Sequence, residues 1–418
     1  MREMKNSGIA WIGEIPADWS LVRFKDKYIN KKEIAGEKSS EYERLALTLN
    51  GVIKRPKDDS EGLQPKEFDG YQILRENDFV FKMIDLQNIS TSRVGLSPYT
   101  GLVSPAYIKF SPRTTGQNNK FVYYYLMSLY YNCVYNNLGG NGVRSALNAK
   151  DMGEFVIPYP NETLQAQISN LLDDKSSQID VLITNQEAQI EKLKQYKQSL
   201  ITEVVTKGLN PDAEMKDSGV EWIGEIPSHW SVIRGKAVLE NLSRKVEPEM
   251  EVITCFRDGE VTLRKNRREE GFTFSDKEIG YQGIYPGDLV IHGMDGFAGA
   301  IGISDSKGKG SPILIVCDSK ENKNYLMYYL RNLAYRDIFL ALSTGIRVRS
   351  CDLRWNKLSV LPFVVPPHKE QEEIIEYLNN KCNQIDKLIE IKQSKIAKLN
   401  EYKKSLIYEY VTGKKEVC

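Results

Sequence analysis

The chain has 418 residues, of which 41% are hydrophobic and 27% are charged, and its formal net charge is +1. This length predicts two or more domains, and the composition is ordinary for a globular protein. No apolar run is long enough to span a membrane, and no apolar segment of a signal peptide follows Met1. Because the net charge is close to zero, it neither favours nor excludes a nucleic-acid partner.

The cysteines are too scattered to form a zinc site or a disulfide framework, because none of them belongs to a CxxC pair. We therefore expect a reducing, cytoplasmic compartment. The six are Cys133, Cys255, Cys317, Cys351, Cys382 and Cys418.

The chain opens with a motif at residues 4–19 that returns at residues 215–230, with eleven of the sixteen positions identical. After each copy, β-branched and aromatic runs alternate with Gly and Pro, which predicts short strands. Examples are residues 78–81 and 106–110 in the first half, and 288–291 and 312–316 in the second. A tyrosine-rich helix is expected after each set, around residues 122–126 and 326–330.

Residues 165–206 are predicted to form one long helix, because apolar residues recur at spacings of three and four and the run contains no Gly or Pro. Asn161 is the expected N-cap, and Gly208 ends the helix. At 1.5 Å per residue this helix is roughly 60 Å long. Residues 371–412 repeat it, with twenty of the 42 aligned positions identical.

Two similar helices, each with an apolar stripe, are expected to pair with each other as a coiled coil. Gln186 and Lys392 interrupt the stripe near each helix centre, and we expect the helices to be antiparallel with a pseudo-dyad near these two residues. The residues predicted to form the helix-pairing seam are Ile179, Leu182, Ile190, Leu193, Leu200, Ile385, Leu388, Ile396, Leu399 and Leu406.

The predicted fold class is α+β: two globular α/β domains separated by two long antiparallel helices that form a coiled coil, with an internal pseudo-two-fold repeat. The expected limits are 1–159 and 211–365 for the globular domains, and 160–210 and 366–418 for the helical regions. The globular domains differ most at residues 30–65 and 241–275, whereas the frame repeats. A repeated arrangement of domains and helices with divergent loops favours two recognition domains held apart by a spacer. Duplex DNA with two half-sites is the natural ligand of such an arrangement.

The chain resembles the DNA sequence-specificity subunits of type I restriction-modification enzymes. The residues that carry the resemblance include Trp11-Ile12-Gly13-Glu14-Ile15-Pro16, its copy Trp222-Ile223-Gly224-Glu225-Ile226-Pro227, and Val103-Ser104-Pro105-Ala106-Tyr107. Others are Gly142-Val143-Arg144, Gly345-Ile346-Arg347 and Pro366-Pro367-His368-Lys369-Glu370-Gln371, whose Glu-Gln pair is replaced by Leu164-Gln165 in the first copy.

The resemblance covers nearly the whole chain in both halves. It implies two target recognition domains that each read half of a split site in double-stranded DNA, and two helical regions that set the spacer and dock two modification subunits. S-adenosylmethionine and adenine methylation then belong to those partner subunits, and this chain binds no cofactor and no membrane. A restriction subunit that translocates DNA is a further expected partner.

No catalytic constellation is recognised in the sequence, so we expect a subunit that is not itself an enzyme. His229, His292 and His368 are scattered without metal-ligand spacing, and neither a GxSxG motif nor a P-loop is present. Two alternatives stay open: a binding module for RNA or protein with the same geometry, and a fused nuclease.

The candidates for DNA contact are two basic clusters in the divergent segments, together with side chains suited to phosphate or adenine. Arg144 and Arg347 occur in both halves, so we expect them to hold phosphate or structure and not to specify a base. Trp11, Trp19 and their copies are expected to fasten each globular domain to its long helix. The candidate DNA-binding residues are Lys54, Arg55, Lys57, Gln87, Arg144, Arg264, Lys265, Asn266, Arg267, Arg268 and Arg347.

Overall fold

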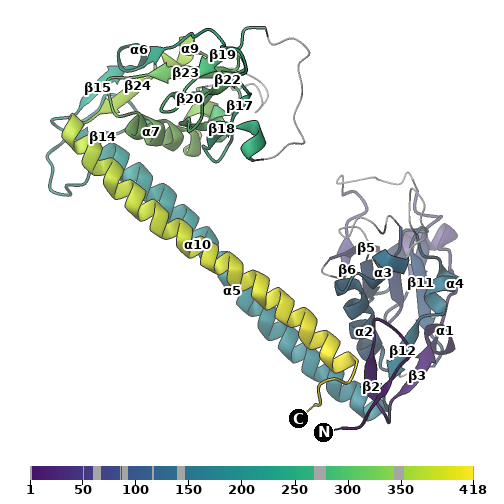
Figure 1. Ribbon diagram of the computed structural model, residues 1–418. Helices are drawn as coiled ribbons and strands as arrows, with labels where there is room; N and C mark the ends of the chain where they lie inside the picture. Colours follow the sequence, from purple (N-terminus) through teal and green to yellow (C-terminus); the bar gives the residue numbers. More distant parts are fainter. Residues whose placement is uncertain are drawn as a thin grey trace. The chain divides into compact units, whose positions relative to one another are not determined.

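The computed structural model describes residues 2–417 except 50, 60–66, 85, 87–92, 115–116, 139–145, 268–278 and 343–352. The chain divides into two compact units (Figure 1). Unit 1 comprises Met1–Gln186 and Ser394–Cys418, and unit 2 comprises Glu187–Gln393. Each unit therefore contains one globular part and a segment of each long helix. Among the described residues, no helix is both long and apolar enough to cross a membrane.

The globular part of unit 1 is built from short strands with a few helices, as the Gly and Pro spacing predicted. Two four-stranded sheets run in the orders β6-β5-β10-β7 and β4-β11-β8-β9, beside the pairs β1-β2 and β12-β3. The strands are β1 (Met4–Asn6), β2 (Glu14–Pro16), β3 (Ser20–Arg23), β4 (Tyr28–Ile29), β5 (Arg44–Thr48), β6 (Gly51–Arg55), β7 (Gln72–Leu74), β8 (Phe79–Lys82), β9 (Arg93–Leu96), β10 (Gly101–Val103), β11 (Ile108–Pro112) and β12 (Val156–Tyr159). The helices are α1 (Phe24–Lys27), the 3₁₀ helix η1 (Gly36–Glu41), α2 (Asn119–Tyr131), α3 (Val134–Leu138) and α4 (Ala149–Gly153).

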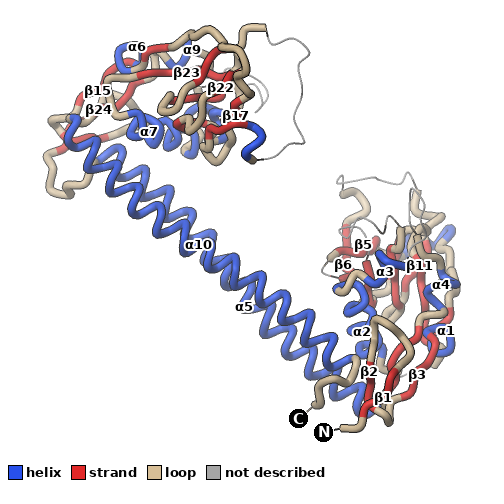
Figure 2. The backbone as a smooth tube through the Cα atoms, viewed as in Figure 1, coloured by secondary structure: helices blue, strands red, loops and turns tan. Residues whose placement is uncertain are grey.

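Unit 2 repeats this plan with its own strands, and the strands of both globular parts stand out in red in Figure 2. Its sheets are β16-β23-β20-β21, β13-β14, β15-β24, β17-β18 and β19-β22. The strands are β13 (Met215–Asp217), β14 (Glu225–Pro227), β15 (Ser231–Arg234), β16 (Glu240–Asn241), β17 (Ile253–Cys255), β18 (Val261–Leu263), β19 (Gln282–Ile284), β20 (Leu289–His292), β21 (Ile301–Ile303), β22 (Gly308–Gly310), β23 (Leu314–Asp318) and β24 (Pro362–Val365). The helices are α6 (Gly235–Val238), η2 (Arg264–Asn266), η3 (Gly296–Ala298), α7 (Lys323–Tyr335), α8 (Ile338–Ala341) and α9 (Trp355–Leu358).

The two globular parts share most of their strand order, although the sheet β6-β5-β10-β7 of unit 1 corresponds to two separate pairs, β17-β18 and β19-β22, in unit 2. The sheet β4-β11-β8-β9 matches β16-β23-β20-β21, and the opening motifs form the equivalent pairs β1-β2 and β13-β14. The tyrosine-rich helices α2 and α7 begin at the equivalent caps Asn118 and Asn322, whose side chains accept backbone hydrogen bonds. The internal repeat is therefore a repeat of structure as well as of sequence.

The two long helices are α5 (Glu162–Lys207) and α10 (His368–Val411). Asn161 caps α5 as predicted, because its Oδ1 accepts from the backbone N–H of Leu164 at 2.9 Å. Gly208 ends the helix in the left-handed conformation with φ of 74°, which favours glycine. Both long helices are stabilised mainly by the packing of their apolar faces, because intrinsic helix propensity alone contributes little stability.

Within each unit, α5 and α10 pair through a buried seam. In unit 1, Ile168, Leu172 and Ile179 of α5 share a core with Leu406, Ile407, Tyr410 and Val411 of α10, and Lys403 Nζ lies 2.7 Å from Asp180. In unit 2, Lys197 Nζ lies 2.7 Å from Asp386, and Lys392 contacts Gln189. The α10 number falls from 392 to 386 as the α5 number rises from 189 to 197, so the helices are antiparallel. The two ion pairs are equivalent in the repeat, since both partners are displaced by 206 residues.

The seam predicted from the sequence is wrong at Leu182 and Leu388, whose relative exposures are 44% and 47%. The buried and partly buried positions on α5 advance by alternating steps of four and three through Ile179, Ile183, Gln186 and Ile190, with Ile183 partly buried, so Leu182 lies one position off the seam. Ile389 replaces Leu388 in the same way. The pairing of Gln186 with Lys392 stays a prediction, because these residues belong to different units.

Candidate nucleic-acid interface

The two basic clusters chosen from the sequence lie on equivalent hairpins. Strands β5 and β6 pair with Leu45 opposite Lys54, and β17 and β18 pair with Ile253 opposite Leu263. Arg55 therefore occupies the place that Arg264 occupies in unit 2, opposite Arg44 and Val252 respectively. Each hairpin also joins the next strand pair by a parallel contact, Arg44 with Leu102 and Val252 with Lys309. The sequence alone did not reveal this equivalence, because the intervening segments differ in length and composition.

The cations of the unit 1 hairpin are anchored within the protein. Lys54 Nζ lies 2.5 Å from Glu43, which directly precedes β5, and 5.2 Å from the centre of the Tyr99 ring. The Arg55 side chain pairs with Asp59. Lys57 Nζ donates to the carbonyl oxygen of Ser39 at 2.8 Å. These contacts hold three positive side chains on one edge of the hairpin.

The unit 2 hairpin anchors its cations differently. Lys265 pairs with Glu251, which precedes β17 as Glu43 precedes β5, whereas Asn266 Nδ2 donates to Thr262 Oγ1 at 2.9 Å. Arg264 Nε lies 3.4 Å from Thr254 Oγ1. Arg267 binds Asp258 and Glu260 from the β17–β18 turn. The two hairpins thus share a position in the repeat and differ in their side chains.

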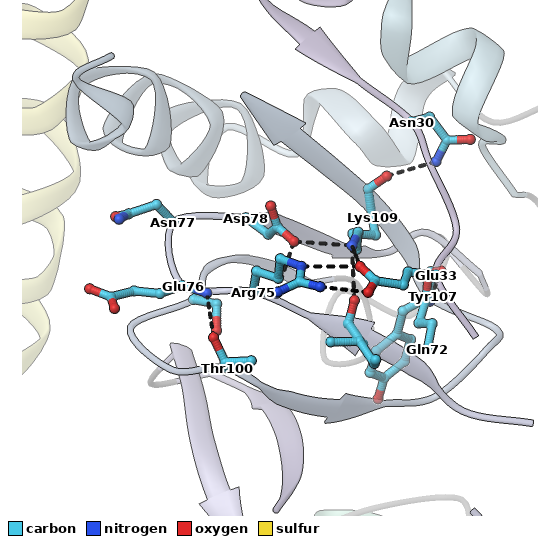
Figure 3. A network of polar contacts seen from close by, with 12 residues as sticks. Asn30, Glu33, Gln72, Arg75, Glu76, Asn77, Asp78, Thr100, Tyr107 and Lys109 are labelled. Carbon is cyan, nitrogen blue, oxygen red and sulfur yellow. Dashed lines mark hydrogen bonds and ion pairs between the residues drawn. The ribbon is translucent and has the colours of Figure 1, made fainter. Parts of the chain in front are cut away.

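A buried ion pair lies between the two four-stranded sheets of unit 1, where Lys109 of β11 contacts β7 (Figure 3). Lys109 on β11 and Asp78 before β8 are each 3% exposed, and Lys109 Nζ lies 3.2 Å from Asp78 Oδ2. Lys109 Nζ also donates to the carbonyl oxygen of Ile73 at 2.9 Å. Next to the pair, Arg75 Nη2 donates to Glu33 at 2.6 Å, and this hydrogen bond lowers the pKa of Glu33 against the opposing effect of burial.

The aspartate is repeated in unit 2, but the cation that balances it comes from another element. Asp78 and Asp288 both accept from a backbone N–H three residues before them, of Arg75 and Tyr285. Asp288 pairs with Arg244, while the strand position of Lys109 is taken by Val316. The Asp288 carboxylate raises the pKa of Arg244 through its hydrogen bond. Equivalent aspartates are therefore neutralised from different places: by Lys109 on β11 in unit 1, and by Arg244 in the segment after β16 in unit 2.

Four of the predicted contact residues, Gln87, Arg144, Arg268 and Arg347, lie outside the described residues. The carboxylates that hold the basic clusters, Glu43, Glu251, Asp258 and Glu260, were missed. These carboxylates could have been identified only from their proximity to Lys and Arg across each hairpin. That proximity depends on the strand register, which the sequence alone does not specify.

The three histidines have structural contacts. His292 accepts from the backbone N–H of Asp295 at 2.9 Å, and its burial lowers its pKa. His229 Nε2 lies 2.6 Å and His368 Nδ1 3.6 Å from the carboxylates of Glu370 and Glu321. In the part of the chain that the structure describes, no group of three or more His, Cys, Asp or Glu is arranged to hold a metal ion.

The tryptophans that end the opening motifs pack against the long helices, as predicted. Trp19 and Trp230 are each 1% exposed. Trp230 Nε1 donates to Glu370 Oε2 at 2.9 Å, whereas Trp19 Nε1 has no partner among the described residues. Leu164 is the repeat of Glu370. The first copy of the motif therefore lacks the carboxylate that accepts a hydrogen bond from the tryptophan N–H in the second copy.

We expect Glu370→Leu to lower the free energy of unfolding by about 1–3 kcal/mol, because it leaves the buried Trp230 N–H without an acceptor. Urea unfolding followed by tryptophan fluorescence measures the change. Glu373→Leu is the matched control on the same helix, because the Glu373 side chain is 54% exposed and its ion pair with Lys369, at 3.8 Å, is a weak surface contact. That control is expected to cost less than about 0.5 kcal/mol, and equal losses in the two variants would contradict the assignment.

Fold and site together define a tandem-repeat protein in which two α+β units share one frame and carry different polar surfaces on equivalent hairpins. The profile of the family described as Type I restriction modification DNA specificity domain matches residues 21–192. The Type I restriction enzyme MjaVIII specificity subunit of Methanocaldococcus jannaschii is 26% identical, over 96% of this chain and 93% of that protein. The chain is therefore similar over nearly its whole length to type I restriction enzyme specificity subunits, and residues 21–192 match the DNA specificity domain of that family.

A solved structure supports the same fold. A chain from a study of complex assembly and conformational transition of the type I R-M system superposes with a TM-score of 0.68 at 14% identity. The match covers 96% of this chain and 99% of that chain. The similarity therefore extends over both repeats and both long helices.

Proposed function

We propose that this chain is the sequence-specific DNA-binding subunit of a type I restriction-modification complex. The observation that carries the proposal is the pair of equivalent hairpins, which hold different basic side chains on the same frame. A common frame fits a common polymer, and different side chains fit different base sequences. Neither alternative, a module for RNA or protein or a fused nuclease, gains support from the family relationship.

DNA recognition divides between two kinds of contact. Lys54, Lys57 and Lys265 carry compact point charges suited to phosphate oxygens, and their neutralisation of phosphates would make binding fall as salt rises. Base selection needs donors held in a fixed direction at the edge of a groove. We assign unit 1 to one half-site and unit 2 to the other, with the long helices fixing the unread spacer.

The same long helices would dock the partners that carry out chemistry. Each unit exposes one leucine and one tyrosine from them: Leu182 and Tyr402 in unit 1 are 44% and 54% exposed, and Leu388 and Tyr196 in unit 2 are 47% and 55% exposed. Leu388 and Tyr402 are the repeats of Leu182 and Tyr196. Matching exposed apolar side chains favour two copies of one partner, the modification subunit.

In this proposal the chain itself is not an enzyme. S-adenosylmethionine binds the modification subunits, which methylate DNA at the site that this chain selects, and a restriction subunit joins the complex. The complex works in the cytoplasm, where its DNA is found.

A selection experiment tests the function. The full-length chain with its modification subunits is incubated with a randomised duplex library, and the bound fraction is sequenced, in the presence and absence of excess RNA. We expect a two-part consensus with an unread spacer that RNA does not suppress. Recovery of no consensus, or loss of DNA binding in the presence of the excess RNA, would contradict the proposal.

A further inference from the structure

The guanidinium of Arg267 is held in one orientation by the turn of its own hairpin. Nη1 donates to Asp258 Oδ1 at 2.9 Å and to Glu260 Oε2 at 3.1 Å, and Nη2 donates to Asp258 Oδ2. The guanidinium also lies 4.2 Å from the centre of the Phe256 ring. A planar cation fixed by two carboxylates and an aromatic face loses little conformational freedom when it binds a further group.

Among the described residues, these contacts leave one edge of the Arg267 guanidinium without a protein partner. Of its five N–H groups, both on Nη1 and one on Nη2 are used, which leaves Nε–H and the second Nη2–H on the same side. Among the residues that the structure describes, none accepts from Nε. The Arg267 side chain is 36% exposed. The remaining edge is a two-donor fork, and this fork matches the O6 and N7 acceptors of guanine in the major groove.

The charge around Arg267 favours a base over a phosphate. Asp258 and Glu260 together carry two negative charges beside the single positive charge of Arg267. Arg331, which also interacts with Asp258, brings the sum over these four described side chains to zero. A phosphate contact depends on net positive charge, whereas guanine O6 and N7 are neutral acceptors. The neighbouring cations differ: Lys265 has no fork, and the Nε of Arg55 already donates to Asp59 in unit 1.

We propose that Arg267 reads one guanine in the half-site recognised by unit 2, an inference that rests on the proposed function. Nε and Nη2 donate to O6 and N7, and Asp258 and Glu260 position the fork without touching the base. Arg267 is then a specificity-determining residue, and the two carboxylates are positioning residues.

The test compares variants of the full-length chain, assembled with modification subunits, against the randomised duplex library. We expect the wild-type consensus to contain a guanine at one position of one half-site, and Arg267→Ala to reduce the preference for that guanine by about 10- to 100-fold. Arg267→Lys keeps the charge but not the fork, so the same loss is expected. Asp258→Asn weakens the hold on the fork, and a smaller loss is expected at that same position only.

Arg257→Ala is the matched control, because Arg257 belongs to the same turn and pairs with Asp295 at 67% exposure. It is expected to leave every base preference unchanged. An unaltered consensus in Arg267→Ala, or an equal weakening at all positions, would overturn the assignment while leaving the proposed function intact. Failure of the wild-type complex to select any consensus would instead overturn both. The half-site of unit 1, unchanged in every variant, reports that the chain is folded.

Discussion

Removal of residues 394–418 is expected to unfold unit 1 while unit 2 stays folded. This segment contributes Leu406, Ile407, Tyr410 and Val411 to the core of unit 1, each of them at most 8% exposed. Burial of four such side chains stabilises by roughly 6–12 kcal/mol at 1.5–3 kcal/mol each, which is comparable to the whole stability of a domain. Gly413 also packs against Pro16 and Trp19 of the opening motif. Hydrogen exchange of the shortened chain measures both units in one experiment.

A point substitution tests the packing of the second long helix against unit 1 without shortening the chain. Ile407→Ala should lower the free energy of unfolding of unit 1 by about 2–5 kcal/mol, because Ile407 is 2% exposed. Tyr402→Ala on the same helix is the control, since Tyr402 is 54% exposed and its loss should cost less than about 0.5 kcal/mol. Protection of unit 1 amides that survives the removal of residues 394–418 would show that unit 1 does not depend on the second long helix.

Lys109→Val should destabilise unit 1 by about 3–5 kcal/mol, the second largest effect that we expect. The substitution copies the residue found in unit 2, where Arg244 pairs with Asp288. Among the described residues of unit 1, Lys109 alone forms an ion pair with Asp78, so the variant leaves the 3%-exposed carboxylate of Asp78 buried without its cation. Urea unfolding of the variant and the wild type at pH 7 measures the loss.

The double variant Lys109→Val with Asp78→Asn is the control for this prediction. Asparagine keeps an oxygen that accepts from the backbone N–H of Arg75 and removes the buried charge. A large part of the stability should therefore return. If the double variant were as unstable as Lys109→Val alone, the loss would come from packing around Lys109 and not from an unpaired charge.

The frame of the molecule could be predicted because it depends on local and repeated patterns. Asn161 and Gly208 mark the ends of α5 by capping chemistry, and the 206-residue repeat predicted a second helix with the same ends. The seam was harder to predict from the sequence, because Leu182 and Ile183 are adjacent apolar residues and only the packing shows that Ile183 faces the partner helix. A short apolar doublet on a long helix does not specify which member faces the partner.

The candidate site was harder to predict because it depends on strand register. Arg55 and Arg264 are equivalent only once β5–β6 and β17–β18 are aligned, and the carboxylates that orient Arg267 come from a turn that no local pattern singles out. Lys109 was read from the sequence as part of a strand, and its buried partner Asp78 lies across the sheet at a separation of 31 residues. Long-range pairing of this kind is set by the fold and not by sequence periodicity.

The measurement that tests the central claim most directly is the methylated sequence produced by a chimera of this chain. Residues 20–155 are replaced by the equivalent segment of a relative with a different specificity, and genomic methylation is profiled with the modification subunits present. Separate reading by the two units predicts that one half of the bipartite sequence changes to that of the relative, while the other half and the spacer stay the same. A change in both halves, or in neither, would contradict the claim that each unit reads its own half-site.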